Sequence, residues 1–509
     1  MTFDEAQGYA VLATLAAPLL AMLLLVFIPG SQKMLVRYVS LFFAAIMLGL
    51  SVYIFAAYQV HGPDLGPGSQ IQMQLRWAWV ENTGILGENG ISFYLGVDGI
   101  SATMALLTGV VAFAGCLASW KLDFRPKDFF ILFWMLVGGV YGTFFSLDLF
   151  FFFFFYELAV VPLYLLIGVW GSTRKEYGAM KLTLMLVAGS VLIWIGIFAV
   201  FHEAGLGTFD MVRLWAAGSD GTLDPTFQKT FFPLFVIGCG VLAALWPFHT
   251  WSPDGHMSAP TAVSMVHAGV LMKLGAFGII RLGIQLLPVG AEFWMPGLMV
   301  LGTIGAVYGA TAALTQRDFK LISGYSSVSH MGYVLMGLAT MNSIGITGAV
   351  LQMFSHGVMT ALVFLMIGAL YDQAHTRDLK DFGGLGKVMP TWVVFYTIAG
   401  LANVGLPGLS GFTAEFHIFV ATFRTYPLFG GLAIFAAALA AGYMLRMFSI
   451  VFFGPLNPRW GGGALRDLRP LEVMAGGLLI ASIVVMGVWW APFTDRIGAS
   501  VTLIPGVTG

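Results

Sequence analysis

The sequence predicts an all-α polytopic membrane protein, and three observations lead to that fold class. The first is composition, because 58% of the residues are apolar and 10% are charged, far from the balance of a soluble globular domain. The second is the grouping of apolar residues into stretches long enough to cross a bilayer. The third is a regular alternation of basic residues between successive connections. Little of the chain remains for a soluble domain.

Roughly fourteen stretches reach the about 20 apolar residues that a helix needs to cross the hydrocarbon core. The predicted spans are 9–29, 36–58, 97–118, 128–147, 148–171, 179–203, 230–251, 258–287, 294–314, 318–341, 343–372, 390–424, 428–454 and 471–493. They divide the chain into four segments: 1–127 with the first three helices, a first repeat at 128–287, a second repeat at 294–454, and a last helix within 455–509.

The connections between these spans alternate in charge. Connections after odd-numbered spans hold most of the lysines and arginines, whereas those after even-numbered spans hold mainly Arg76, Arg213 and Lys229. Because basic connections are retained on the cytoplasmic side, we expect both termini on the outer face. The polar connection 59–96, rich in glycine and aromatic residues, is expected to form a folded cap on that face.

Two predicted spans contain sequences that break a helix. Span 7 contains Pro247 and Pro253, and span 12 contains Pro407 between Gly405 and Gly408. A proline inside a helix removes a backbone hydrogen bond and kinks or breaks it. The breaks lie five helices apart, which predicts two inverted five-helix repeats, spans 4–8 and 9–13, with broken helices 7 and 12 and ion sites near mid-membrane. The alternative is that both are ordinary proline kinks.

Ionisable residues inside the predicted spans are candidates for an ion path. Glu157, Lys273 and Glu415 each lie within a span, and charges at membrane depth usually face a bundle interior and mark such a path. The alternative for each is a purely structural ion pair. Cys116 and Cys239 lie in separate apolar stretches without a second ligand nearby, so we expect neither a disulfide nor a metal site.

Two consecutive spans carry polar stripes at helical spacing, which predicts that the stripes face each other and hold waters. The residues are Ser323, Ser326, Ser327 and His330 in span 10, and Gln352, His356 and Thr360 in span 11. An imidazole can pass protons in either direction near neutral pH. The alternatives are two hydrogen-bonded interior histidines or the ligands of a haem; the serine and glutamine flanks leave little room for a porphyrin.

Several motifs occur in order along nearly the whole chain. They are Asp148-Leu149-Phe150 through Phe155-Tyr156-Glu157-Leu158, Pro162-Leu163-Tyr164, Pro247-Phe248-His249-Thr250-Trp251 to Pro260-Thr261, Tyr325-Ser326-Ser327-Val328-Ser329-His330-Met331-Gly332 and Gly411-Phe412-Thr413-Ala414-Glu415-Phe416. Together they make the chain similar to the antiporter-like subunits of complex I. Within that family, glutamate at position 415 is typical of the M subunit, homologous to mitochondrial subunit 4, whereas the L, N and Mrp relatives usually carry lysine.

The resemblance implies a function and a setting. It implies a proton-translocating subunit of NADH:quinone oxidoreductase in a bacterial inner membrane, with fourteen helices, placed between the N and L subunits. It also implies no cofactor and no redox chemistry in this chain, with NADH, FMN, iron–sulfur clusters and quinone on partner subunits. The expected partners are those subunits and the lipid bilayer, and no nucleic acid is expected.

The resemblance also assigns roles to individual residues. Glu157 corresponds to the helix-5 glutamate, Lys273 to the helix-8 lysine, His330 and His356 to histidines of a central axis, and Glu415 to an exit-side glutamate. Quinone reduction elsewhere would change the charge of a neighbouring subunit and perturb Glu157. Lys273 would then be loaded from the cytoplasm and pass its proton along the histidines to Glu415 for release.

One position departs from the family pattern. The lysine expected seven residues before the histidine of the Pro-x-His motif is replaced by Leu242, which removes the usual partner of Glu157. His267 stands where an apolar residue is expected, so histidine could replace the lysine. Alternatively, Glu157 pairs with Lys181 or another helix, or stays protonated. Other functions remain open: an Mrp-type antiporter, a membrane hydrogenase or ferredoxin-linked complex that moves sodium, or a non-pumping spacer.

Overall fold

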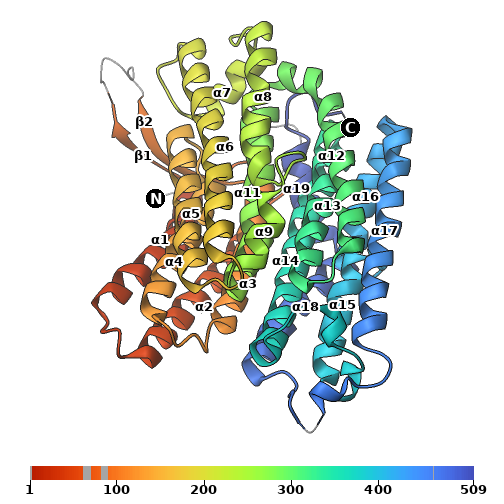
Figure 1. Cartoon of the computed structure of the whole chain (residues 1–509). Helices are drawn as coiled ribbons and strands as arrows, with labels where there is room; N and C mark the ends of the chain where they lie inside the picture. The colour runs from red at the N-terminus through yellow and green to blue at the C-terminus, as the bar shows by residue number, and fades with distance from the viewer. Residues whose placement is uncertain (1–2, 61–69, 82–89, 462, 509) are drawn as a thin grey trace.

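Long helices run side by side through most of the chain, with a two-stranded hairpin at one end of the bundle (Figure 1). This computed structural model describes residues 3–60, 70–81, 90–461 and 463–508. Its first half contains α1 (Phe3–Phe27), α2 (Lys33–Ala57), β1 (Gln72–Val80), β2 (Ile91–Val97), α3 (Gly99–Ala118), α4 (Pro126–Phe145), α5 (Leu149–Trp170), α6 (Lys175–Ala204), α7 (Met211–Ser219), α8 (Pro225–Leu242), α9 (Trp251–Ser258), α10 (Thr261–Val266) and α11 (Met272–Gly278).

The second half is helical throughout its core. It contains α12 (Pro288–Thr315), α13 (Phe319–Ala339), α14 (Ser343–Ala374), α15 (Pro390–Asn403), α16 (Ser410–Thr425), α17 (Pro427–Val451), α18 (Pro470–Val488) and α19 (Ala491–Val501). Two π-helical segments, His267–Leu271 and Ile279–Ile284, flank α11. Such segments are rare and often occur at functional sites.

The predicted membrane spans coincide with helices of the structure. Among the described residues, eleven helical segments are long and apolar enough to cross a membrane. The remaining predicted spans correspond to α8, α13 and the pair α15 and α16; α15 and α16 are individually short, and α13 carries the polar stripe. The polytopic helical fold class is therefore confirmed, whereas the inverted relation of the two repeats and the segment boundaries stay predictions.

The predicted breaks in spans 7 and 12 are present. The helix of span 7, α8, ends at Leu242, and span 12 is two helices separated at 404–409. The structure corrects the prediction in two other places. The short helices α7 and α19 were not predicted, since they are too short and amphipathic to resemble a span. The connection 59–96 contains the strands β1 and β2, so the fold is not purely helical; its residues 61–69 and 82–89 lie outside the described part.

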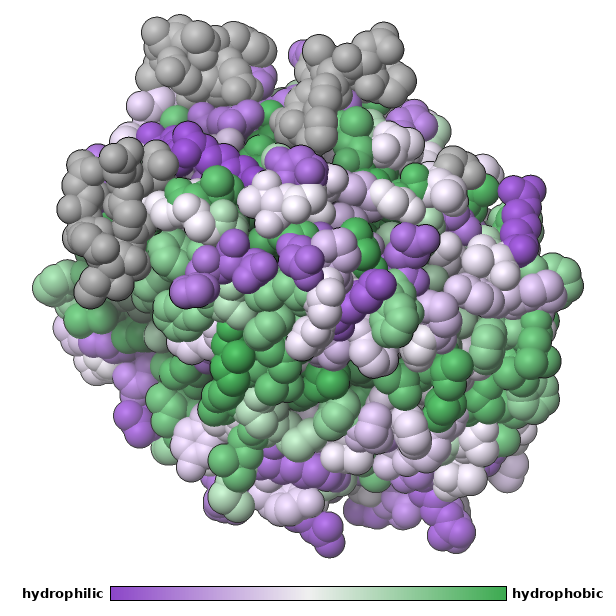
Figure 2. All heavy atoms as spheres, turned by 90° about the horizontal axis from the view of Figure 1, so that it is seen from above, coloured by the Kyte–Doolittle hydropathy of each residue, from purple (hydrophilic) through white to green (hydrophobic). Residues whose placement is uncertain are grey.

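The hairpin packs on the start of α5. Its strands are antiparallel, with Trp77 opposite Phe93, and Trp79 stacks on Phe151 with ring centroids 4.6 Å apart. Arg76 of β1 also pairs with the buried Asp210 at 2.9 Å. Part of the phenylalanine-rich start of α5 therefore packs against the hairpin. We call this end of the bundle the hairpin face; Figure 2, which views the molecule from above, shows hydrophilic and hydrophobic side chains interspersed there.

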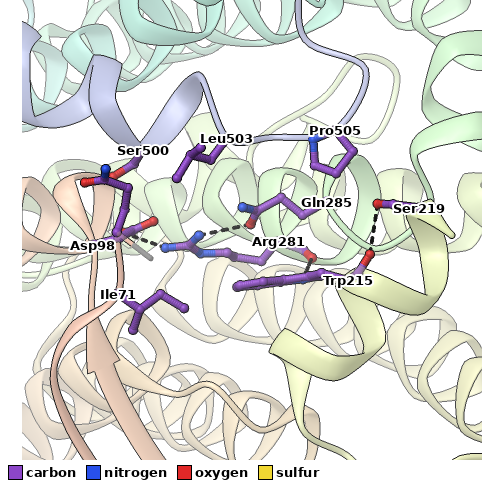
Figure 3. A pocket seen from close by; sticks show the side chains of 10 residues that line it. Ile71, Asp98, Trp215, Ser219, Arg281, Gln285, Ser500, Leu503 and Pro505 are labelled. Atoms are coloured by element: carbon purple, nitrogen blue, oxygen red, sulfur yellow. Dashed lines mark hydrogen bonds and ion pairs between the residues drawn. The ribbon is translucent and has the colours of Figure 1, made fainter. Parts of the chain in front are cut away.

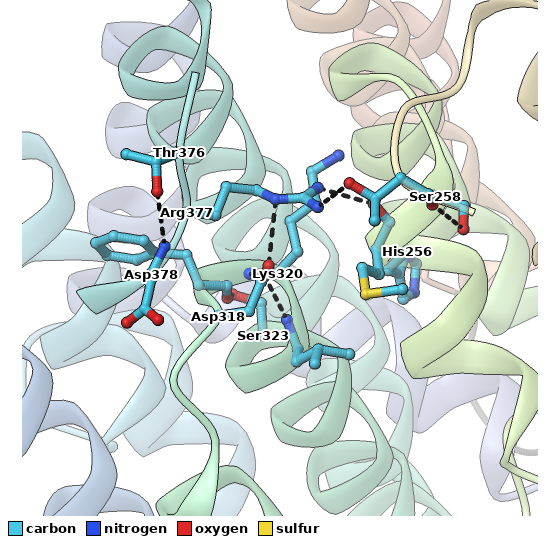
Figure 4. A network of polar contacts seen from close by, with 12 residues as sticks. His256, Ser258, Asp318, Lys320, Ser323, Thr376, Arg377 and Asp378 are labelled. Carbon is cyan, nitrogen blue, oxygen red and sulfur yellow. Dashed lines mark hydrogen bonds and ion pairs between the residues drawn. The ribbon is translucent and has the colours of Figure 1, made fainter. Parts of the chain in front are cut away.

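The opposite end, the basic face, is formed by the predicted basic connections. Arg377 after α14 donates to the Met257 carbonyl at 2.8 Å and to the Thr173 hydroxyl at 3.0 Å. Lys320 at the start of α13 donates to the Ala259 carbonyl at 2.6 Å. These bonds join connections that are far apart in sequence, as Figure 4 shows. Which face is cytoplasmic stays a prediction.

The broken helices keep their backbone groups paired inside the bundle. At the first break, the Trp251 indole donates to the Val241 carbonyl at 2.9 Å, and the Leu245 amide donates to the Gly240 carbonyl at 2.8 Å. At the second break, Gly405 and Gly408 have φ values of 76° and 90°, a conformation that glycine adopts without strain. Irregular backbone at membrane depth persists only where such partners are available.

A glycine contact sets the distance between α14 and the segment that precedes Lys273. A Cβ atom on Gly357 would lie 2.5 Å from the carbonyl oxygen of Gly269, and a Cβ atom on Gly269 would lie 3.2 Å from the carbonyl oxygen of Gly357. The two backbones can approach this closely only because both residues lack a side chain. This approach brings the middle of α14 to the level of Lys273.

We predict that Gly357→Val destabilises the protein, because the new side chain overlaps the backbone of the facing segment. Overpacking of this kind costs about 1–3 kcal/mol. Gly168→Val in α5 is the matched control, since a Cβ atom there meets nothing within 4 Å. Thermal unfolding of the purified complex and the amount assembled measure the difference. Equal behaviour of the two variants would show that the close approach is not required.

Candidate functional site

Lys273 lies at the centre of the bundle with its ammonium group paired. Its side chain is 0% exposed, and its Nζ atom contacts Nδ1 of His356 at 2.6 Å. Nζ also donates to the Ala268 carbonyl, within the π-helical segment that precedes α11. When Lys273 is protonated its ammonium group has donors only, and in that state Nδ1 of His356 accepts from it and the imidazole proton lies on Nε2.

His330 continues the line from His356 toward α16. The two imidazole rings lie 5.5 Å apart between centroids. Nδ1 of His330 is 3.0 Å from Nε2 of Gln352 and 3.3 Å from Oε1 of Glu415. These neighbours suit different protonation states: the amide donates to a neutral ring, whereas a protonated ring donates to the carboxylate. His330 therefore has a partner in both states.

Glu415 ends this line beside the second helix break. It is 4% exposed, and a Cβ atom on Gly405 would lie 2.7 Å from its Oε2 atom. The break thus leaves room for the carboxylate because glycine occupies the position that faces it. We call Lys273, His356, His330 and Glu415 the central axis. The structure brings together these four predicted site residues, although their roles are not tested by the geometry alone.

The serines predicted to share this axis have other partners. Ser323 and Ser327 donate to carbonyl groups of their own helix. Ser326 joins a separate cluster, with the Tyr443 hydroxyl at 2.8 Å and the Asn403 amide at 2.9 Å. Ser326 therefore lies off the line of histidines. The water chain along the serine stripe stays a prediction, since a serine that donates to its own helix keeps an oxygen that can accept from water. Of the second stripe, Gln352 and His356 lie on the axis, and Thr360 donates to the His356 carbonyl at 2.5 Å.

Glu157 lies apart from the axis, at a groove on the side of the bundle. The groove measures about 330 Å³ and is lined by Met135, Phe150, Phe153, Phe154, Leu158, Val161 and Trp194. Oε1 of Glu157 is buried without a hydrogen-bond partner. In the part of the chain that the structure describes, no lysine, arginine or histidine forms an ion pair with it. The Ser190 hydroxyl is its polar neighbour.

Both predicted partners of Glu157 lie elsewhere. Lys181 is bonded to Asp254 at 2.6 Å, so the pairing of Lys181 with Glu157 is wrong. The ring of His267 packs between Trp251 and His256, with centroid distances of 5.1 Å and 4.7 Å. His267 therefore points toward α9, and its exchange for the missing lysine at Leu242 is also wrong.

Sequence reasoning missed a buried ion pair near the hairpin face, shown in Figure 3. Arg281 pairs with Asp98 at 2.7 Å, with side chains 4% and 7% exposed. Arg281 also donates to the Gln285 side chain at 2.9 Å and packs over the Trp215 ring. The pair lines a cavity of about 40 Å³, room for one or two waters. The sequence did contain a signal for this pair, because Arg281 is a charged residue inside a predicted span, about two helical turns after Lys273.

The fold and site define a polytopic helical membrane protein whose interior holds a line of ionisable side chains. The family model described as NADH:quinone oxidoreductase/Mrp antiporter, transmembrane, matches residues 146–440. The NAD(P)H-quinone oxidoreductase chain 4 1 of Synechococcus sp. (strain JA-3-3Ab) is 36% identical over 485 residues, which cover 94% of this chain and 89% of that protein. The chain therefore belongs to this family and is an antiporter-like subunit of complex I.

Solved structures agree with this assignment. A chain of respiratory complex I from Thermus thermophilus with bound NADH has a TM-score of 0.84 and 25% identity, covering 97% of this chain and 99% of that one. A chain of the Mrp complex from Dietzia sp. DQ12-45-1b has a TM-score of 0.80 at 19% identity, covering 99% and 98%. The second likeness shows a shared fold alone.

We predict that Asp98→Asn lowers the stability of the protein, because it leaves Arg281 buried and charged without a counterion. Asparagine keeps an oxygen that can accept from the Ser101 amide, as Asp98 does at 2.8 Å, so the α3 cap is retained. Removing one partner of a buried pair costs about 3–5 kcal/mol.

The matched control is Asp123→Asn, which removes the exposed partner of Arg37, and such pairs contribute about 0–1 kcal/mol. Thermal unfolding of the purified complex compares the two variants. An equally small effect of both would contradict a stabilising role for the buried pair.

Proposed function

We propose that this chain translocates protons along the central axis, from Lys273 through His356 and His330 to Glu415. The observation that carries the proposal is a line of four buried groups that can each gain and lose a proton. Lys273 contacts His356, the rings of His356 and His330 lie 5.5 Å apart between centroids, and His330 contacts Glu415. Charged groups at membrane depth cost about 2.5–3.5 kcal/mol on insertion scales and usually serve an ion path. A structural ion pair would need only one cation and one anion, whereas the central axis has four ionisable side chains in a line.

The order of contacts suggests the order of proton movement. Charged Lys273 donates to Nδ1 of His356, and a proton transferred there leaves an imidazolium that releases its other proton from Nε2 toward His330. Nε2 of both histidines is buried without a hydrogen-bond partner, and buried polar atoms of this kind are usually bridged by water. To receive it, His330 holds its own proton on Nδ1, directed at Glu415, and accepts the incoming proton on Nε2. It then passes the Nδ1 proton to Glu415, which releases it toward the hairpin face, and Nδ1 of the neutral ring accepts from Gln352.

The donor set favours protons over a metal cation. Hard cations take several oxygen ligands, whereas the axis offers one carboxylate among nitrogen groups. We therefore assign proton transfer rather than sodium transfer to this chain. The rings of His330 and His356, the pair that a haem would require, lie 5.5 Å apart between centroids, which leaves no room for a porphyrin between them. The redox cofactors NADH, FMN, iron–sulfur clusters and quinone are assigned to partner subunits.

Glu157 is proposed as the point where a neighbouring subunit acts on this chain. It opens onto a lateral groove, has no cationic partner among the described residues, and keeps one carboxylate oxygen unpartnered. A basic side chain of an adjacent subunit would stabilise its charged form, and withdrawal of that side chain would favour the neutral form. We place the chain between the N and L subunits of a bacterial inner membrane, with the basic face toward the cytoplasm and both termini outside.

We predict that His330→Ala combined with His356→Ala removes the protons pumped by this subunit, because alanine cannot carry a proton between Lys273 and Glu415. The readout is the ratio of protons pumped to electrons transferred by the complex in proteoliposomes, normalised to the assembled complex. His202→Ala combined with His375→Ala, at exposed ends of helices, is the control and should pump normally.

A normal ratio in the axis variant would refute the proposed function. A spacer role predicts a different pattern, namely fewer assembled complexes with an unchanged ratio in each.

A further inference from the structure

A groove of about 680 Å³ lies on the side of the bundle, at the hairpin-face ends of α2 and α18. Because α3 packs against both α2 and α18, α3 forms the floor of this groove and the other two helices form its walls. The apolar lining includes Val52 and Phe55 of α2, Leu106 of α3, Val485 of α18 and Phe493 of α19. Ligand pockets measure about 300–1,000 Å³, so this groove, which we call the α2–α18 groove, has room for a bound molecule.

The groove extends from the end of the bundle into the depth of the membrane. Leu106 lies seven residues after the start of α3, about 10 Å along the helix axis, or roughly a third of the hydrocarbon core. Phe493 closes the inner side, packing on Phe55 at 5.0 Å and on Phe354 of α14 at 5.1 Å between ring centroids. An apolar hollow that follows the helices inward matches a hydrocarbon chain standing along the membrane normal.

The mouth of the groove lies where lipid headgroups meet the hydrocarbon core. Trp489, which lines the groove, is 65% exposed, and its neighbour Trp490 is 45% exposed. Tryptophan is enriched at membrane–water interfaces, where its ring sits at the level of the headgroups. Two charged residues of α19, Asp495 and Arg496, follow and also line the groove. A lipid whose acyl chain enters the groove therefore has its headgroup beside α19.

Arg496 is held in place at this mouth. Its Nε atom donates to the Phe55 carbonyl at 2.9 Å, and its Nη1 atom donates to the Pro492 carbonyl at 2.9 Å. The Phe55 carbonyl is one of the last four of α2, which have no partner within their helix, and the guanidinium also packs over the Phe55 ring at 4.7 Å. Nη2 has no hydrogen-bond partner among the described residues. A fixed guanidinium with free donors is suited to a phosphate group.

Asp495 adds the opposite charge at the same mouth. Its side chain is exposed, and within the described ranges it forms neither an ion pair nor a hydrogen bond. A carboxylate beside Arg496 repels a headgroup that is only anionic. It attracts a headgroup that carries a cation next to its phosphate, and a primary ammonium group can also donate a hydrogen bond to it.

We propose that the α2–α18 groove binds phosphatidylethanolamine, with an acyl chain along Leu106, the phosphate at Arg496 and the ammonium group at Asp495. This lipid site is independent of proton transfer along the central axis. Phosphatidylcholine has no N–H group to donate to Asp495, and phosphatidylglycerol has no cation at all. The two adjacent charges therefore distinguish phosphatidylethanolamine from lipids with the same acyl chains.

The test reconstitutes the whole complex in vesicles that contain one photoactivatable lipid, either phosphatidylethanolamine, phosphatidylcholine or phosphatidylglycerol, with identical diazirine-bearing acyl chains. Mass spectrometry maps the labelled residues of this chain after illumination. Phosphatidylethanolamine should label Val52, Leu106 and Val485 about two- to fivefold more strongly than either other lipid, which is the effect of one exposed ion pair. Equal labelling by the three lipids would overturn the proposal.

Two substitutions test the headgroup contacts. Asp495→Asn should make phosphatidylethanolamine and phosphatidylcholine label the groove equally, whereas Glu203→Gln, an exposed acid at the hairpin-face end of α6, should keep the preference. Arg496→Gln should lower labelling of the groove by all three lipids about tenfold, because each loses a charged hydrogen bond to its phosphate. Arg424→Gln, an exposed arginine at the end of α16, is the matched control.

The Asp495→Asn result decides the headgroup assignment even if Arg496→Gln assembles poorly, because Asp495 is exposed and has no bonding partner in the described part of the chain. An unchanged preference for phosphatidylethanolamine in Asp495→Asn would overturn the assignment. Absence of lipid labels in the groove, together with cross-links from the groove to a neighbouring subunit, would show that a protein segment occupies it and would also overturn the proposal.

Discussion

The contact between Lys273 and His356 is the interaction on which the rest of the interior depends. A lysine that is 0% exposed at membrane depth persists only with partners for its ammonium group. His356 can be that partner because the glycines Gly269 and Gly357 let their two backbones approach. The π-helical segments on either side of α11 adjust the register of the Lys273 side chain within the same helix. Two glycines thus set the contact between two buried ionisable side chains.

The two sets of buried charges differ in what they can do. Arg281 is always charged and has a fixed counterion in Asp98 at 2.7 Å, so this pair holds the bundle together near the hairpin face. The central axis instead consists of groups that are able to change protonation state, and one of them, His330, has two alternative partners in Gln352 and Glu415. An ion pair with fixed partners, such as Arg281 and Asp98, is suited to stabilising the fold. A line of side chains that can exchange hydrogen-bond partners is suited to passing protons.

Sequence predicted most of the helices and the central axis, for identifiable reasons. Lys273, His330, His356 and Glu415 interrupt apolar spans, and helical periodicity placed the two histidines on polar stripes. The partners of Glu157 were not predicted, because which side chains meet across helices depends on packing that a single sequence does not specify. The partners of Ser326 were not predicted either: it contacts Tyr443 and Asn403, because a pattern within one helix does not specify which neighbouring helix each polar side chain meets.

The proton-to-electron ratio of the Lys273→Met complex is the most direct test of the central claim. Methionine keeps the length of the side chain and removes the proton that would enter the axis. We predict a ratio reduced by the full contribution of this subunit, with Lys127→Met at the exposed start of α4 unchanged. A normal ratio in the Lys273→Met complex, measured at equal assembly and equal quinone reduction, would contradict proton transfer through Lys273.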